Sequence, residues 1–188
     1  VAIIGMVANT AVLSVWAPET VKEFQRDPAR APALLGSMAE RLVAGFACVW
    51  LAITAAGGDL IRLLAAPAFH PATDVVPFIA AAVMFHGIIH LANAVFLLMK
   101  RLERTLWIWI GGGILSIILN MALIPISGIL GAAISQTVSF FSIALGMAVG
   151  AQHLYPLQLN WHRLTCIFAG ILVAGAIIDH DHFEIAVA

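Results

Sequence analysis

The chain alternates between long apolar blocks and short polar segments, and this pattern limits its possible folds more than any other feature. A helix that crosses the hydrocarbon core of a bilayer needs about 20 apolar residues. Helices are expected because an unpaired strand edge cannot be exposed to lipid. The sequence predicts an all-α, polytopic transmembrane bundle of about six spanning helices. The expected spans are residues 1–17, 42–58, 75–99, 105–124, 129–151 and 164–178.

The composition indicates that lipid is the surrounding solvent. Hydrophobic residues make up 62% of the chain and charged residues 10%, whereas a soluble domain has about 25% charged residues. A chain of 188 residues with so few charges could not cover a water-exposed surface. The formal net charge of −1 gives no electrostatic support for nucleic-acid binding. We therefore expect the lipid bilayer as a partner and no nucleic acid.

The basic residues predict how the bundle is oriented. If the blocks alternate across the membrane, the segments 18–41, 100–104 and 152–163 lie on one side and contain eight of the nine Lys and Arg residues. The opposite side has Arg62 alone. Because basic residues are enriched in cytoplasmic loops, the three segments are predicted to be cytoplasmic. The expected location is the cytoplasmic (inner) membrane, with several passes.

Polar side chains inside a span are candidates for function, because an ionisable group in lipid is costly. His86, His90 and Asn93 are spaced to share one face of a helix, and Lys100 is expected to continue that stripe. The stripe either lines a water-filled cavity that contacts a sugar or phosphate group, or bonds to neighbouring helices. Both interpretations stay open. A metal site is not expected, because no third ligand lies nearby in sequence.

Small residues at a spacing of four predict close helix packing in the two blocks 105–124 and 129–151. The first block carries Gly112, Ser116 and Asn120. The second carries Ser135, Ser139, Ser142, Gly146 and Gly150. Their hydroxyls can bond across to a neighbouring helix. Packing is the favoured interpretation. Substrate contact is the alternative, and Asn120 is a candidate for it.

Three further polar residues are substrate candidates. Gln136 carries a long amide that needs a partner in lipid. Glu40 and Arg41 lie at the entry of the block 42–58. They are expected to mark the headgroup boundary, and a charged gate or an anionic-lipid site is the alternative. The sequence has no nucleophile elbow and no phosphate-binding glycine loop, so we expect neither an enzyme nor a cofactor.

The segment from Asn120 to Ser135 resembles a family motif. It reads NMALIPISGILGAAIS and is similar to the N-x-x-L-I-P-x-x-G-I-x-G-A-A-I hallmark of polysaccharide-transport flippases. These belong to the MATE-like multidrug/oligosaccharidyl-lipid/polysaccharide exporter superfamily. The upstream segment 59–77 and the basic turn at 100–101 are similar to the same family, and the resemblance covers roughly residues 1–161.

The motif also has a physical logic. Proline disrupts a helix interior, and glycine allows backbone conformations that other residues avoid. Pro125 is therefore expected to end a helix, and Gly128 to permit a tight turn. Gly131, Ala132 and Ala133 are small enough for the next helix to start against its neighbour.

The resemblance implies an alternating-access transporter with two six-helix lobes around a central cavity. Such proteins move lipid-linked oligosaccharide, including O-antigen units of lipopolysaccharide, to the outer leaflet. The chain is then expected to be an incomplete C-terminal lobe, whose partners are the lipid-linked glycan and the missing N-terminal lobe of the same chain. The sequence departs from the family pattern at His70 and Pro71, where the family often has tyrosine or other residues after a glycine.

Two other functions stay open. A multidrug or small-cation exporter of the same superfamily would need a carboxylate inside the membrane, and the blocks contain none beyond Glu40 at an edge. A membrane-embedded enzyme of glycan assembly would need a large loop or a carboxylate-rich site. The longest loop, 18–41, has no obvious metal-binding pair. The flippase is therefore the leading hypothesis.

Overall fold

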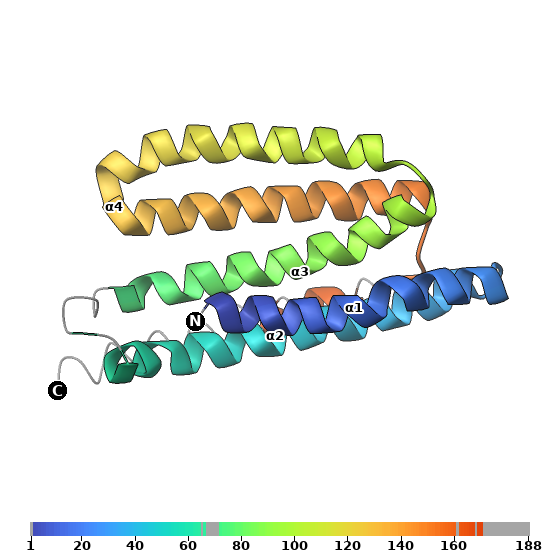
Figure 1. The fold of residues 1–188 in the computed structure, drawn as a ribbon, viewed down its shortest axis with the longest axis horizontal. Helices are drawn as coiled ribbons and strands as arrows, with labels where there is room; N and C mark the ends of the chain where they lie inside the picture. Colours follow the sequence, from blue (N-terminus) through green and yellow to red (C-terminus); the bar gives the residue numbers. More distant parts are fainter. Residues whose placement is uncertain (1, 65, 67–71, 161, 168, 171–188) are drawn as a thin grey trace.

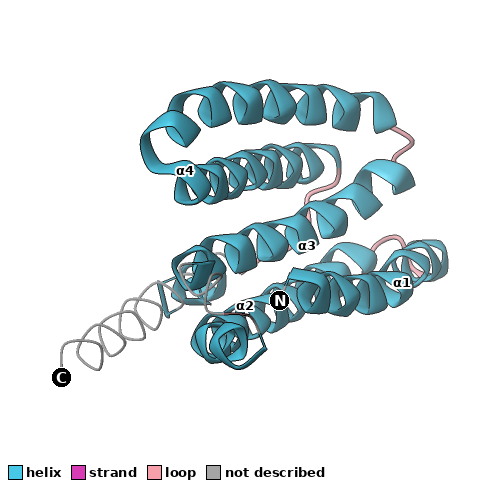
Figure 2. Ribbon diagram, turned by 60° about the vertical axis from the view of Figure 1, so that its left-hand side comes forward, coloured by secondary structure: helices cyan, strands magenta, loops and turns pink. Residues whose placement is uncertain are grey.

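The fold is a bundle of long helices that lie side by side (Figures 1 and 2). A computed structural model describes residues 2–64, 66, 72–160, 162–167, 169 and 170. Within these residues there is no strand, so the predicted all-α bundle is confirmed. The long helices are α1 (Ala2–Arg26), α2 (Ala31–Leu64), α3 (Val76–Leu98) and α4 (Leu102–Leu154).

Several of the helices are suited to a membrane. By length and composition, the described helices that could cross one are Ala31–Leu63, Ala72–Leu98 and Leu102–Leu154. α1 is not among them, although the sequence predicts a span at 1–17. The chain is therefore a helical membrane protein with at least three helices of spanning character.

α4 consists of two antiparallel arms joined by a sharp kink. A straight helix of 53 residues would be about 80 Å long, more than twice the hydrocarbon thickness of about 30 Å. At Gly128 the backbone has φ 55° and ψ −126°, a conformation that residues with a side chain rarely adopt. Figure 1 shows the chain reversing direction within α4, between the two arms. The arms correspond to the predicted spans 105–124 and 129–151, and the expected turn at Gly128 is confirmed.

Small residues allow the two arms to approach each other. An added Cβ at Gly131 would overlap the carbonyl oxygen of Leu123, and one at Gly112 would overlap the side chain of Ile143. Ala133 is buried in the same region, and Ala132 is half-buried. These contacts confirm the prediction of close packing. The expected end of a helix at Pro125 is wrong, because Pro125 lies inside the first arm.

The buried serines bond differently from the prediction. The Ser135 hydroxyl donates to the carbonyl oxygen of Gly131 at 2.9 Å, and the Ser139 hydroxyl donates to that of Ser135 at 2.7 Å. Both bonds stay within one helix, as is common for serine in an apolar helix interior. These hydroxyls therefore find their hydrogen-bond partners within their own helix. The serines contribute to the packing of the arms through their small size.

The first two helices extend beyond their predicted spans. α1 continues through Pro18, and α2 begins well before residue 42. Glu40 and Arg41 consequently lie inside α2, which corrects their predicted position at its entry. Of the predicted span 164–178, residues 168 and 171–178 lie outside the described residues, as do His70 and Pro71.

Most of the basic residues lie toward one end of the bundle, which we call the basic end. Figure 1 shows the α1–α2 turn, the α3–α4 turn and the end of α4 at the same end, and the kink at Gly128 at the other. The described residues of segments 18–41, 100–104 and 152–163 carry eight basic residues there, whereas Arg62 lies near the opposite end of α2. The predicted segregation of charge is thus present in the fold.

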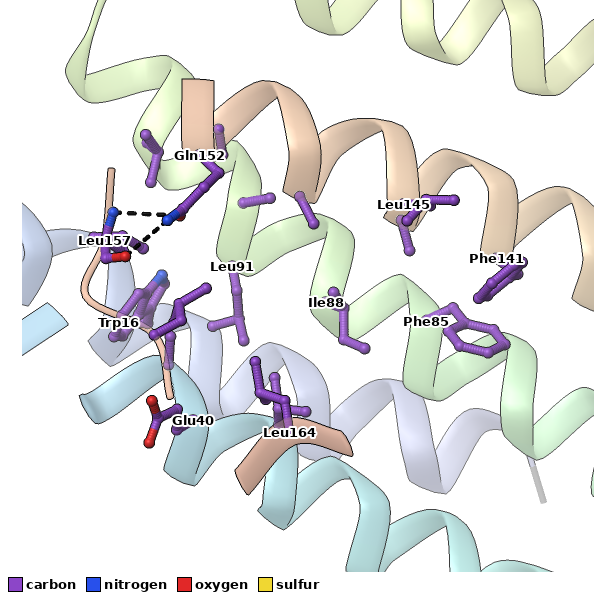
Figure 3. Close-up of a pocket in the computed structure, with 18 residues that line it drawn as sticks. Trp16, Glu40, Phe85, Ile88, Leu91, Phe141, Leu145, Gln152, Leu157 and Leu164 are labelled. Carbon is purple, nitrogen blue, oxygen red and sulfur yellow. Dashed lines mark hydrogen bonds between the residues drawn. The ribbon is translucent and has the colours of Figure 1, made fainter. Parts of the chain in front are cut away.

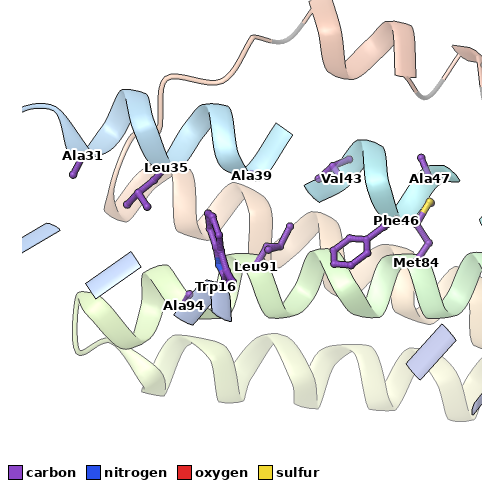
Figure 4. Close-up of a cluster of buried hydrophobic side chains, with 10 residues drawn as sticks. All are labelled: Trp16, Ala31, Leu35, Ala39, Val43, Phe46, Ala47, Met84, Leu91 and Ala94. Carbon is purple, nitrogen blue, oxygen red and sulfur yellow. The ribbon is translucent and has the colours of Figure 1, made fainter. Parts of the chain in front are cut away.

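α3 is the central helix and joins two apolar clusters. In the first cluster Leu91 packs with Trp16 of α1 and with Leu35 and Phe46 of α2 (Figure 4). In the second, Phe96 and its neighbours pack against the second arm of α4. α3 therefore holds the α1–α2 pair and the α4 hairpin together, and a cavity lies where these parts meet.

Candidate functional site

An apolar cavity of about 250 Å³ lies between the helices. Figure 3 shows its walls, which come from all of α1 to α4. Trp16 contributes from α1, Val43 from α2, Ile88 and Phe85 from α3, and Phe141 from α4. Such mostly apolar concave sites with a few polar groups are typical of small-molecule binding sites. The cavity is therefore the candidate site.

The cavity is open along the second arm of α4. Phe141 and Leu145 line it and are nevertheless 49% and 53% exposed. Ala148, on the same face of the arm, also lines it and is exposed. An opening bordered by apolar side chains on a membrane helix faces lipid or another membrane-embedded part.

Polar side chains reach the cavity from Glu40 and Gln152. Glu40 is only 7% exposed. Its carboxylate accepts a hydrogen bond from the backbone N–H of Asn160 and lies 3.9 Å from a guanidinium nitrogen of Arg163. A charged group in such a position is stable only with partners of this kind. Arg41, the neighbour of Glu40, is exposed and does not line the cavity.

Residues 155–160, which we call the strap, follow α4 and lie against α2. Gln152 binds the strap twice: its side-chain N–H donates to the carbonyl oxygen of Leu157 at 2.8 Å, and its carbonyl accepts from the N–H of Leu157 at 3.3 Å (Figure 3). The N–H of Gln158 donates to the carbonyl oxygen of Pro32 at 3.2 Å. A Cβ added at Gly36 would lie 2.6 Å from the carbonyl oxygen of Gln158. The strap is thus fixed to both α2 and α4.

Sequence reasoning missed Gln152 and the strap. Gln152 lies one residue beyond the predicted span 129–151, where a polar residue is unremarkable. Glu40 and Asn160 are separated by 120 positions, so no local pattern pairs them. The one available signal was a glutamate beside an apolar block, which the prediction assigned to the headgroup boundary.

The predicted histidine stripe does not reach this cavity. His86 and His90 contact each other, with 3.3 Å between their Nε2 atoms, and the His86 ring packs edge-on against Phe140 at 5.7 Å between centroids. Both histidines and Asn93 are half-buried, and none of them lines the cavity. Phe85 and the other α3 residues that line the cavity lie on another face of this helix. His86 thus packs against the second arm of α4, while His90 contacts His86 within α3.

Lys100 does not continue the stripe, which corrects the prediction. It lies beyond the end of α3, is exposed, and has φ 54°. The N–H of Arg101 donates to the carbonyl oxygen of Phe96 at 2.9 Å, and the N–H of Lys100 donates to that of Leu97 at 3.1 Å. This bond pair is a Schellman motif, with Lys100 in the left-handed position that glycine usually occupies. Lys100 ends a helix and starts the turn to α4.

Asn120 and Gln136 also lie away from the cavity lining. The side-chain amide of Asn120 donates to the backbone oxygen of Ser116 at 2.9 Å, so it is satisfied within its own helix. Gln136 is exposed. Its neighbour Thr137, which the sequence analysis did not single out, donates to the carbonyl oxygen of Phe78 at 2.8 Å and so links α4 to α3.

Comparison with protein-family models, with curated proteins and with solved structures found no match. A cavity that is apolar along its length and carries polar groups toward the basic end suits an amphiphile, with a hydrocarbon chain along the walls and a polar group near that end. It also suits a hydrophobic cation, for which Glu40 would be the counter-charge.

Proposed function

We propose that the chain is part of a membrane transporter that moves lipid-linked oligosaccharide or polysaccharide repeat units across the cytoplasmic membrane by alternating access. The cavity is the observation that carries this proposal. Its apolar walls and its opening along α4 fit the hydrocarbon chain of a lipid carrier. Phosphate groups of the carrier would be attracted by the basic residues at the nearby end of the bundle.

The family motif supports the same proposal. Its proline and glycines lie in the α4 hairpin, where Gly128 makes the turn and Gly131 permits the close approach of the arms. We further propose that the basic end is cytoplasmic, because basic residues are retained on that side during insertion. The segments 18–41, 100–104 and 152–163 would then be cytoplasmic. A second lobe would complete the transport path.

One observation favours a second function, export of hydrophobic cations. A carboxylate within a membrane helix is costly and often marks an ion or substrate path. Glu40 fits this description better than the sequence suggested, because it lies inside α2 and lines the cavity. Its carboxylate already has two partners, Asn160 and Arg163, so a cation would have to displace them. Lipid-linked glycan transport therefore stays the leading proposal.

A cavity-filling substitution tests the leading proposal in cells that depend on this protein for surface-glycan export. Ala148→Trp places a large side chain at the opening of the cavity without disturbing a buried position. Val149→Trp is the matched control, because Val149 is equally peripheral but does not line the cavity. We expect Ala148→Trp to reduce surface glycan strongly and Val149→Trp to leave it unchanged, at equal protein levels.

The opposite result separates the two functions. Normal glycan export by Ala148→Trp would contradict the proposal. If Glu40→Gln instead made the cells sensitive to hydrophobic cations while glycan export stayed normal, the second function would be supported. His86→Ala and His90→Ala are expected to retain export, because neither residue lines the cavity.

A further inference from the structure

The strap closes the end of the cavity nearest the basic end. Leu157 and Leu159 of the strap line the cavity, and so does Leu164 just beyond it. Figure 3 shows the strap running from Leu157, beside Gln152 of α4, toward Glu40 of α2. With the strap in this position, its leucines separate the apolar interior from the polar surroundings of the basic end.

Individual hydrogen bonds to α2 and α4 hold the strap in place, not the regular bonding of a helix. Its residues lie outside the helices, so they have little of the regular backbone bonding that stabilises α2 and α4. The described bonds to α2 are those of Gln158 to Pro32 and of Asn160 to Glu40. The Arg163 side chain is 73% exposed and lies 3.9 Å from Glu40, a geometry in which ion pairs contribute little. Segments outside regular helices open more readily than the helices around them.

We propose that the strap is a latch that gates the passage between the cavity and the basic end, and that Glu40 and Gln152 hold it closed. When these two side chains release the strap, Leu157 and Leu159 move away and the cavity becomes continuous with water at the basic end. The opening along α4 admits a hydrocarbon chain from lipid, whereas the latch controls the access of polar groups. The latch acts on the cavity of the proposed function, but its test does not depend on transport.

Cysteine modification measures the opening of the latch. Cys48 and Cys166 are both exposed and are first replaced by serine. Leu91→Cys then places a reporter on a cavity wall next to the strap, where the native side chain is buried. The rate of its reaction with a charged methanethiosulfonate reagent is measured in detergent micelles. A charged reagent reaches this position through water and not through the apolar opening along α4.

The latch predicts which substitutions expose the reporter. Glu40→Ala removes the fastening to Asn160, and Gln152→Ala removes the one to Leu157. Because each change removes a hydrogen-bond partner of the strap on a neighbouring helix, each is expected to raise the reaction rate at position 91 by about tenfold or more. Arg41→Ala is the matched control, since it removes a charge from the exposed neighbour of Glu40 and should leave the rate unchanged.

A second reporter distinguishes latch opening from unfolding. Ile89→Cys is buried on the other side of α3, in the cluster with α4, and does not line the cavity. The proposal predicts that Glu40→Ala and Gln152→Ala leave its slow reaction unchanged. Equal rates at position 91 with and without these substitutions would overturn the latch. A parallel rise at positions 89 and 91 would overturn it too, because the effect would then be general loosening of the bundle.

Discussion

Leu123 and Gly131 contact each other through the backbone, because an added Cβ at Gly131 would overlap the carbonyl oxygen of Leu123. The two arms of α4 thus meet just beyond the kink at Gly128 without room for a side chain. We predict that Gly131→Ala forces the arms apart and lowers the free energy of unfolding by about 1–3 kcal/mol. Thermal unfolding in detergent, followed by circular dichroism, measures this change.

A neighbouring glycine provides the control for the α4 hairpin. Nothing lies within 4 Å of a Cβ added at Gly113, which is in the first arm of the same helix. Gly113→Ala is therefore expected to be neutral or stabilising, since alanine favours helix by about 1 kcal/mol over glycine. Equal effects of Gly131→Ala and Gly113→Ala would show that the arms do not meet in this way.

The left-handed backbone conformation of Lys100 predicts that a substitution at this position can stabilise the protein. Its φ of 54° lies in the left-handed region, which costs a residue with a side chain about 1–2 kcal/mol relative to the right-handed one. Glycine adopts this conformation without the steric cost, so Lys100→Gly should raise the unfolding temperature. Arg101→Gly, one residue further on, has no such strain to relieve and should not raise it. A lower unfolding temperature for Lys100→Gly would argue against the Schellman turn.

A substitution at Gly36 tests how closely the strap lies against α2. A Cβ at this position would be 2.6 Å from the carbonyl oxygen of Gln158, so Gly36→Ala must displace the strap. The expected loss is about 1–3 kcal/mol in the free energy of unfolding. Amide hydrogen exchange should show faster exchange at Gln158, whose N–H is bonded to Pro32. Gly45→Ala, in the same helix with open space around it, should change neither quantity.

The features that the sequence predicted correctly are local ones. Apolar length and small-residue spacing indicated the α4 hairpin, and Gly128 marked its turn, because a tight reversal needs a residue that tolerates positive φ. The end of α3 was harder to predict, since a lysine occupies the position at which glycine is usual. The helical continuation through Pro18 was likewise hidden, because proline normally indicates the end of a helix.

The candidate site depended on contacts that no local pattern contains. The buried carboxylate of Glu40 accepts a hydrogen bond from a backbone N–H of the strap, 120 residues later. Helix periodicity predicted that the histidines share one face of a helix. It does not predict which element covers that face. Phe140 packs against His86, while the cavity formed on another face of α3.

α4 is expected to cross the membrane twice, with its kink on the side opposite the basic end. The test uses a protein variant in which Cys48 and Cys166 are replaced by serine. Single cysteines are then introduced at two exposed positions, Arg101→Cys before α4 and Ser127→Cys beside the kink. A membrane-impermeant maleimide should label Ser127→Cys in intact cells and Arg101→Cys only after the membrane is opened. Labelling of both cysteines from the same side would contradict the account.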